Sequence, residues 1–351
     1  MKFLKKHLKF VVITLIIVYV VVFSGYSAWN AANPEHTCAG CHEINPSFHT
    51  WRSSAHKDIQ CIECHGTALS NGFHSLKEKG NMVWTHLTGN KRNADIRLTE
   101  DQLLVTMNAC IQCHQTEYTQ WLSGGHSATY SHIFLNEAHN TMEQPYWDCL
   151  RCHGMFYEGT IYDLMEPIST HGPWRLLDEQ QAEKPVMPCF ACHQIHTPNP
   201  GMFTDVTHAD SPKTSADRKR WNLKRNPAAA LYVRADQMYL RTDLLPMPDM
   251  YHNGRKLLVS DDPVQRLCIQ CHAPNYRRFS GSEDDRTPRG VHEGLSCRSC
   301  HNVHSNDASQ SCMSCHPAIS NCGLDVTTMN TTFFDPLSRN NIHFVSCEDC
   351  H

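Results

Sequence analysis

The chain has 351 residues, of which 19 are Cys and 25 are His, and a formal net charge of −4 at pH 7. Four lysines fall within the first nine residues, so the remainder holds 27 basic against 35 acidic residues, a charge of −8. This charge excludes nucleic acid and anionic headgroups as natural partners of the remainder, because like charges repel. Hydrophobic residues make up only 40% of the chain even with the cysteines counted, which predicts a core filled partly by something other than side chains.

Residues 1–32 combine a basic N-terminus with a long apolar segment. The apolar run is nearly unbroken from Phe10 to Phe23 and extends more mildly to Trp29. Its length matches the about 20 residues needed to cross a bilayer, with Tyr26 and Trp29 at the outer interface and the lysines inside. A secretion signal cut near Ser27 or Ala28 is the alternative. No A-x-A pattern closes the segment, so we favour a retained anchor in the cytoplasmic membrane. With either reading the remainder lies in the periplasm.

The cysteines follow one repeated pattern, C-x-x-C-H, which occurs nine times and takes 18 of the 19. Two thiols at this spacing reach the two vinyl groups of one haem, and the His that follows ligates the iron. Zinc sites do not need His directly after each second Cys, and disulfides would not impose one spacing nine times. We therefore expect nine covalently attached c-type haems, with Cys322 left over as a lone buried thiol or a special ligand.

The nine motifs are numbered here in chain order. Each is given as its first Cys, its second Cys and the His expected to ligate the iron. They are motif 1, Cys38, Cys41 and His42; motif 2, Cys61, Cys64 and His65; motif 3, Cys110, Cys113 and His114; motif 4, Cys149, Cys152 and His153; motif 5, Cys189, Cys192 and His193; motif 6, Cys268, Cys271 and His272; motif 7, Cys297, Cys300 and His301; motif 8, Cys312, Cys315 and His316; and motif 9, Cys347, Cys350 and His351.

The spacing of the motifs divides the chain into groups. We expect a cytoplasmic tail and anchor over 1–32, a membrane-proximal dihaem region over 33–92, a trihaem region over 93–200, a helical linker or insertion over 201–260 and a tetrahaem region over 261–351. The linker holds the basic run Asp217–Arg225, either a solvated face or a docking patch for an acidic partner. Asn226 as N-cap and Pro227 as first helical residue predict that a helix follows this run.

Short helices are expected to lead into several motifs. Thr99 and Gln102 form a predicted capping box ahead of motif 3. Pro145 and Pro263 stand at predicted first helical turns ahead of motifs 4 and 6. The alternation typical of strands is scarce. The predicted fold class is mainly α with extensive loops, a haem-packed multihaem cytochrome c with one N-terminal transmembrane helix.

The sixth iron ligand decides what a c-type haem does. A second His favours electron transfer, whereas an open position allows ligand chemistry. Fifteen histidines lie outside the motifs and beyond the anchor, enough for nine haems, and the alternative for each is a surface or core histidine. They are His36, His49, His56, His74, His86, His126, His132, His139, His171, His196, His208, His252, His292, His304 and His343.

Six of these histidines have placements that favour a distal ligand. Three precede a motif by four or five residues, namely His56, His292 and His343. Two follow a motif histidine by three residues, His196 and His304, which aims them at a neighbouring haem. The sixth, His126, belongs to a W-x-S-x-x-H pattern that occurs twice, once from Trp51 to His56 and once from Trp121 to His126.

The first ninety residues combine the anchor with CAGCHEINPSFHTWRSSAH and CIECHGTALSNGFHSLKEKGNMVWTHLTG. They resemble the NapC/NirT family of membrane-anchored quinol dehydrogenases. The resemblance implies that motif 1 holds a haem at the membrane surface, which oxidises quinol and passes electrons outward. It also implies that Lys77, Lys79 and His86 lie on the quinol side. Beyond residue 100, CIQCHQTEYTQWLSGGH and CLRCHG resemble the multihaem cytochromes related to hydroxylamine oxidoreductase, without indicating a substrate.

Three functions fit these motifs. The leading one is electron transfer from membrane quinol, or from a quinol-oxidising membrane partner, to a periplasmic or outer-membrane redox partner. The second is an oxidoreductase with one open-site haem acting on a small nitrogen or sulfur compound. Its best candidates are His126, His132 and His139 with Tyr130. The third is a subunit of a haem filament. Motif 9 is the expected exit for electrons, unless the tail folds back beneath motif 8.

Overall fold

The structure, a computed structural model of the whole chain, divides into two compact units, Met1–Ala109 and Cys110–His351. It describes residues 2–32, 38–41, 44–67, 73–88, 98–195, 230–233, 238–241, 245, 247, 249–272 and 292–305. The five regions expected from the motif spacing stay a prediction, because the division into two units does not distinguish them.

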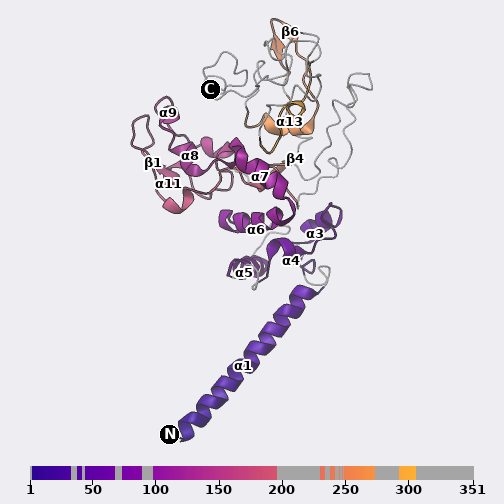
Figure 1. The fold of residues 1–351 in the computed structure, drawn as a ribbon, viewed down its shortest axis with the longest axis vertical. Coiled ribbons are helices and arrows are strands. Elements are labelled where there is room, and N and C mark those ends of the chain that lie inside the picture. Colours follow the sequence, from indigo (N-terminus) through magenta and orange to yellow (C-terminus); the bar gives the residue numbers. More distant parts are fainter. Residues whose placement is uncertain are drawn as a thin grey trace. The chain divides into compact units, whose positions relative to one another are not determined.

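The first unit begins with one continuous helix, α1, over Lys2–Ala31 (Figure 1). Its stretch Lys9–Trp29 is 21 residues long and has a mean hydropathy of 2.4, with none of it buried inside the protein. A helix of this length and composition can cross a bilayer, although a secretion signal passes the same test. Side chains such as Phe10 and Leu15 are exposed. Burial of this apolar surface therefore requires surroundings other than the described part of the chain.

The rest of the first unit is built from short helices. They are α3 (Asn45–Arg52), α4 (Cys61–His65), α5 (Phe73–Thr88) and α6 (Glu100–Cys113), within which the unit ends. The capping box expected at the start of α6 is confirmed. The amide of Thr99 donates to Oε1 of Gln102 at 3.0 Å, and the amide of Gln102 donates to Oγ1 of Thr99 at 3.4 Å. Two amides that have no partner inside the helix are thus satisfied.

The second unit holds short helices and, among its described residues, three two-stranded antiparallel sheets. The helices are α7 (Gln115–Ser123), η1 (Gly125–Ser127), α8 (Tyr130–Phe134), α9 (Glu137–Asn140), α10 (Cys149–Cys152), α11 (Ile161–Leu164), η2 (Glu179–Gln181), η3 (Cys189–Ala191), α13 (Pro263–Cys268) and η6 (Cys297–Ser299). The sheets pair β1 (Met165–Glu166) with β2 (Arg175–Leu176), β3 (Ala230–Val233) with β4 (Met238–Arg241), and β5 (Tyr251–His252) with β6 (Arg255–Lys256). Helix dominates over strand, which agrees with the expected mainly α class.

Apolar packing in the second unit is divided between two clusters. One is centred on the fully buried Tyr130, and Cys149 of motif 4 packs against it. The other contains Tyr232, and Cys192 of motif 5 and Cys271 of motif 6 pack against it. Both clusters therefore lie directly beside cysteines that are expected to carry haem.

The prediction of a helix in the linker is wrong for the residues described there. Instead β3 and β4 form an antiparallel hairpin, with Tyr232 opposite Tyr239. Aromatic and β-branched residues suit strands, and the Tyr232 ring stacks on Phe156 with ring centroids 4.3 Å apart. Packing against a distant segment thus overrides the helix-start signal at residues 226–227, which lie outside the described residues.

The helix before motif 4 begins later than expected. The N-cap of α10 is Asp148, so Pro145 lies ahead of the helix rather than in its first turn. The side chain of Asp148 makes no capping hydrogen bond. The prediction for α13 is confirmed: Pro263 opens the helix, and the carboxylate of Asp262 accepts a backbone hydrogen bond at 3.1 Å.

Candidate haem-binding sites

The local geometry of the motifs is the same wherever the structure describes one completely. In motifs 3 to 7 the backbone N–H of the His donates to the carbonyl of the first Cys, at 2.8–2.9 Å. Motif 2 is itself the helix α4. This helical turn brings two thiols and one imidazole to neighbouring positions, which is the arrangement that two thioethers and an iron ligand on one haem require.

The same turn occurs in motif 3, where the histidine is exposed, and in motif 7, where the histidine is partly buried. The amide of His114 donates to the carbonyl of Cys110, and the amide of His301 donates to that of Cys297, both at 2.8 Å. The side chain of His114 is exposed, and its Nδ1 lies 3.8 Å from a carboxylate oxygen of Glu117. His301 is partly buried. Both imidazoles therefore belong to a closed motif turn, as the sequence predicts for iron ligands.

The motif cysteines are not joined to one another by disulfides among the described residues. This holds for all 14 that the structure describes. Cys64, the second cysteine of motif 2, and Cys300, the second of motif 7, are both partly buried, whereas Cys113 of motif 3 is exposed. Their role in attaching haem stays a prediction from the motif.

Three motifs are described only in part or not at all. Cys38 and Cys41 of motif 1 form a turn, in which the amide of Cys41 donates to the carbonyl of Cys38 at 3.3 Å. The two haem sites expected on motifs 8 and 9 therefore stay predictions from the sequence, as does the role of the lone cysteine. The predicted residues outside the described part of the chain are His42, Cys312, Cys315, His316, Cys322, Cys347, Cys350 and His351.

Two motif histidines of the second unit face a histidine from a different segment. The ring centroids of His193 and His304 lie 6.2 Å apart, and those of His272 and His126 lie 6.1 Å apart. A metal–imidazole bond is about 2 Å long, so an iron held between two imidazoles places their ring centroids about 6 Å apart. The residues present therefore fit two haems, one on motif 5 and one on motif 6, each with a second His available to its iron.

These pairs connect segments far apart in the chain. His304 follows motif 7, yet its ring lies beside that of the motif 5 histidine. His126 follows motif 3 yet faces the histidine of motif 6. Two of the six predicted distal ligands thus lie opposite a motif histidine. A second His, rather than an open position, favours electron transfer.

A further histidine, His139, lies near the motif 4 histidine, His153. Burial among surrounding atoms, with the nearby His139 and His272, lowers the pKa of His153. Nδ1 of His139 lies 3.3 Å from Oδ1 of Asn140, and the buried Asn140 amide donates to the carbonyl of Phe134 at 2.8 Å. A ring held through one nitrogen leaves the other for a metal. A role of His139 as second ligand of the motif 4 haem stays a prediction.

Motifs 4 and 6 are also in direct contact through their cysteines. The thiols of Cys152 and Cys271 are hydrogen-bonded, which lowers the pKa of Cys152 and, with burial, raises that of Cys271. In the first unit, the thiols of Cys38 and Cys61 are hydrogen-bonded in the same way, and this contact raises the pKa of Cys61. Motifs 1 and 2 are therefore neighbours, as motifs 4 and 6 are.

The two W-x-S-x-x-H segments share one contact. Nε1 of Trp51 donates to the carbonyl of Ile59 at 2.9 Å, and Nε1 of Trp121 donates to the carbonyl of Met187 at 3.2 Å. Each acceptor stands two residues before the first Cys of a motif, motif 2 in one case and motif 5 in the other. Each indole therefore holds the backbone that leads into a predicted haem site, which explains the recurring Trp.

Motif 2 has a carboxylate behind its iron ligand. Nδ1 of His65 lies 2.5 Å from Oε1 of Glu78 in α5. Burial opposes a charged ring, but the hydrogen bond and charge of Glu78 outweigh it and raise the pKa of His65. A carboxylate on one ring nitrogen fixes the ring orientation and makes the other nitrogen a stronger ligand. The sequence alone gives no signal for this role of Glu78, because 13 residues separate it from its histidine.

Lys79, the residue after Glu78, connects motif 2 to α1. Its Nζ lies 3.3 Å from the carbonyl of Gly66 and 3.3 Å from the hydroxyl of Tyr26, and 5.3 Å from the Tyr26 ring centroid. Lys79 is one of the three residues implied on the quinol side. The other two, Lys77 and His86, are exposed.

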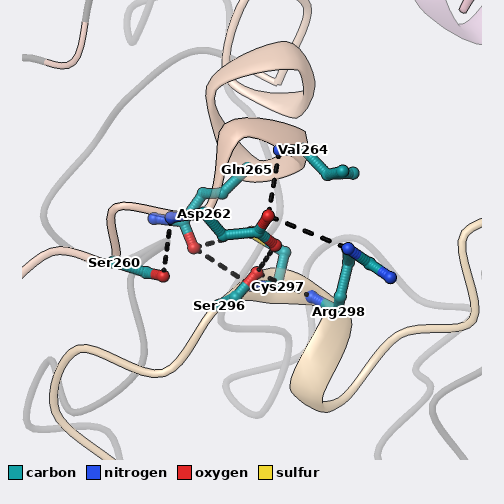
Figure 2. A network of polar contacts seen from close by, with 7 residues as sticks. All are labelled: Ser260, Asp262, Val264, Gln265, Ser296, Cys297 and Arg298. Atoms are coloured by element: carbon teal, nitrogen blue, oxygen red, sulfur yellow. Dashed lines mark hydrogen bonds and ion pairs between the residues drawn. The ribbon is translucent and has the colours of Figure 1, made fainter. Parts of the chain in front are cut away.

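A buried polar network joins motifs 6 and 7, and Figure 2 shows its residues. The carboxylate of Asp262 is fully buried. It accepts a hydrogen bond from the hydroxyl of Ser296 at 2.5 Å and lies 3.8 Å from the guanidinium of Arg298. Oε1 of Gln265 accepts from the amide of Cys297 at 3.1 Å. A buried charge with this many partners is stable and fixes the two segments relative to each other.

Gln265 has one polar atom without a protein partner among the described residues. Its Nε2 is buried and makes no hydrogen bond, while its Oε1 lies 3.7 Å from Sγ of Cys297. Buried amide donors are normally satisfied. The acceptor for this amide is therefore expected outside the described residues or on a bound group.

The segment proposed for an open-site haem has a different arrangement from the one expected. Tyr130 is fully buried and packs against Phe134, with ring centroids 5.9 Å apart. His126 faces the motif 6 histidine, His139 lies near the motif 4 histidine, and His132 is exposed. The three histidines therefore have different surroundings and do not converge with Tyr130 on one site.

The other predicted distal ligands stay predictions. His56 is partly buried, and its amide donates to the hydroxyl of Ser54 at 3.0 Å. His292 lies in the turn before motif 7, where its carbonyl accepts from the amide of Leu295 at 3.1 Å. His196 and His343 lie outside the described residues.

Comparison with protein families gives one match. The family described as cytochrome c554 and c-prime matches residues 109–167 and 249–302, less than half of the chain. These two segments hold motifs 3 and 4 and motifs 6 and 7, and they include His126 and His272, which face each other. No curated protein and no solved structure matches the chain.

The match supports a multihaem c-type cytochrome. Covalently attached c-type haem and electron transfer agree with that match, while the assignment of a haem to each motif stays a prediction from the sequence. The count of nine haems, the link to quinol, and the resemblances to NapC/NirT and to hydroxylamine oxidoreductase relatives remain predictions.

Proposed function

We propose that the chain is a membrane-anchored nonahaem cytochrome c that carries electrons from membrane quinol, or from a quinol-oxidising partner, to a periplasmic or outer-membrane acceptor. The observation that supports this most strongly is the facing of His126 with His272 and of His193 with His304, at a spacing that suits an iron with two imidazole ligands. Haem iron with both axial positions filled exchanges electrons and leaves no position for a substrate.

The residues of the chain position these haems. In motifs 5 and 6, the helical turn presents the thiols and the first imidazole, and a distant segment presents the second. In the second unit, the network around Asp262 fixes motif 7 against the helix that leads into motif 6. A fixed separation between neighbouring haems is what an electron-transfer chain needs.

The proposed entry of electrons is supported by the contacts of Lys79. This residue touches both the end of motif 2 and Tyr26 of α1. If α1 is retained in the membrane, motif 2 and its neighbour motif 1 lie close to the bilayer surface, where quinol is available.

Two measurements on the full-length holoprotein test the proposal. Haem content per chain should be nine, and electron paramagnetic resonance should show low-spin iron that does not respond to nitrite, hydroxylamine or cyanide. In liposomes, a reduced quinol should reduce the haems rapidly only when α1 is present. A high-spin iron that binds one of these compounds would instead favour the oxidoreductase alternative.

A further inference from the structure

Helix α5 has an apolar face that the described protein leaves uncovered. Val83, Trp84 and Leu87 are 59%, 69% and 74% exposed. Their spacing of one and four residues places them on one side of the helix. Glu78 points the other way and contacts the motif 2 histidine. The helix therefore has one side bound to a predicted haem site and an opposite, exposed apolar side.

The position of α5 next to α1 indicates what covers this face. Lys79 of α5 contacts the hydroxyl and the ring of Tyr26. Tyr26 lies three residues before Trp29, which ends the apolar stretch Lys9–Trp29. The apolar face of α5 thus lies close to the level at which α1 would leave the hydrocarbon of a bilayer.

We propose that the face formed by Val83, Trp84 and Leu87 inserts into the boundary between headgroups and acyl chains on the outer surface of the membrane that α1 crosses. Trp and aliphatic residues on one side, with a Lys at the edge, are typical of helices that lie in this layer. Lys77, exposed on α5, supplies that Lys. The proposal rests on the anchor of the proposed function, and does not depend on quinol as the electron donor.

The consequence concerns the orientation of the first unit. A single spanning helix leaves the attached domain free to tilt, whereas a second contact through α5 fixes it. Because Glu78 on the same helix hydrogen-bonds to His65, a fixed α5 also holds motif 2 at a constant distance from the bilayer.

The test uses full-length holoprotein in phosphatidylcholine nanodiscs that contain a lipid with a diazirine near the carboxyl end of one acyl chain, which places the probe at the boundary between headgroups and acyl chains. After illumination and proteolysis, mass spectrometry locates the labelled residues. We expect label on α1 and on residues 81–88. The double variant Trp84→Glu and Leu87→Glu should lose label on α5 several-fold, with the haem spectrum unchanged. The matched control Leu122→Glu, at an exposed Leu of α7, should not change it.

The outcomes separate this proposal from the anchor. Label on α1 without label on α5 overturns the proposal, and means that a haem or a partner protein covers the face. Label on α5 without label on α1 supports the interfacial position of α5 and overturns the retained anchor. Absence of label from both segments overturns both ideas together.

Discussion

The two W-x-S-x-x-H segments, one in each unit, make the same kind of indole hydrogen bond in different surroundings. In both, the indole donates to the backbone two residues before a haem motif. Trp121 is only 8% exposed, whereas Trp51 is partly exposed. In the second unit the pattern also delivers His126 to the histidine of motif 6. The same kind of contact thus arises locally in one unit, across eight residues, and between distant segments in the other, across 66 residues. Burial and ligand pairing likewise depend on what the rest of the unit brings near.

The largest expected effect comes from removing the second imidazole in the second unit. His126→Ala should convert one haem from low-spin to high-spin iron without changing the haem count, because the thioethers do not involve this residue. Electron paramagnetic resonance of the holoprotein measures it. His132→Ala is the matched control, since His132 is exposed in the same segment. Identical spectra for both variants would contradict the pairing of His126 with His272.

The next effect concerns the polar network of the second unit. Ser296→Ala removes a donor 2.5 Å from the buried Asp262 carboxylate, and should cost about 1–3 kcal/mol of stability. The melting temperature of the holoprotein should fall accordingly. Thr141→Ala, at an exposed hydroxyl bonded to backbone, serves as control and should change the melting temperature little. Equal falls in melting temperature for the two variants would show that Asp262 does not need the hydrogen bond from Ser296.

A smaller effect compares the two tryptophans directly. Trp121→Phe and Trp51→Phe each remove one indole hydrogen bond, which is worth about 0.5–1.5 kcal/mol. We expect the larger fall in melting temperature for Trp121, because its surroundings are more buried and the carbonyl it leaves is less able to find water. A larger fall for the Trp51 variant would mean that the first unit depends more on this contact than its exposure indicates.

The smallest expected change is a shift in potential confined to the first unit. Glu78→Gln keeps the shape of the side chain but removes the negative charge beside His65. The haem of motif 2 should then have a more positive potential, because a carboxylate on the proximal ring stabilises the oxidised iron. A spectroscopic redox titration measures this shift as a change in one component. Glu158→Gln, at an exposed residue of the second unit, should leave all components in place.

Much of each haem site follows from a few neighbouring residues. The helical turn of C-x-x-C-H is closed by a hydrogen bond between residues four apart, so the sequence predicts it without knowledge of the fold. The capping box at Thr99 and the start of α13 at Pro263 were predicted for the same reason. The start of α10 was predicted wrongly. The helix begins after Asp148, which makes no side-chain cap, and Pro145 lies ahead of its first turn.

The sequence by itself predicted the cofactor class and the residues expected to attach the haems, and it determined the local turn at each described motif, since these depend on covalent spacing and on short-range hydrogen bonds. Only the tertiary structure decided which imidazole faces which motif, as His304 and His193 come together from distant parts of the chain. It also decided that Glu78 supports motif 2 and that Tyr232 belongs to a hairpin. The physical reason is that these choices depend on packing between segments, and packing partners are set by the whole fold rather than by the neighbouring residues.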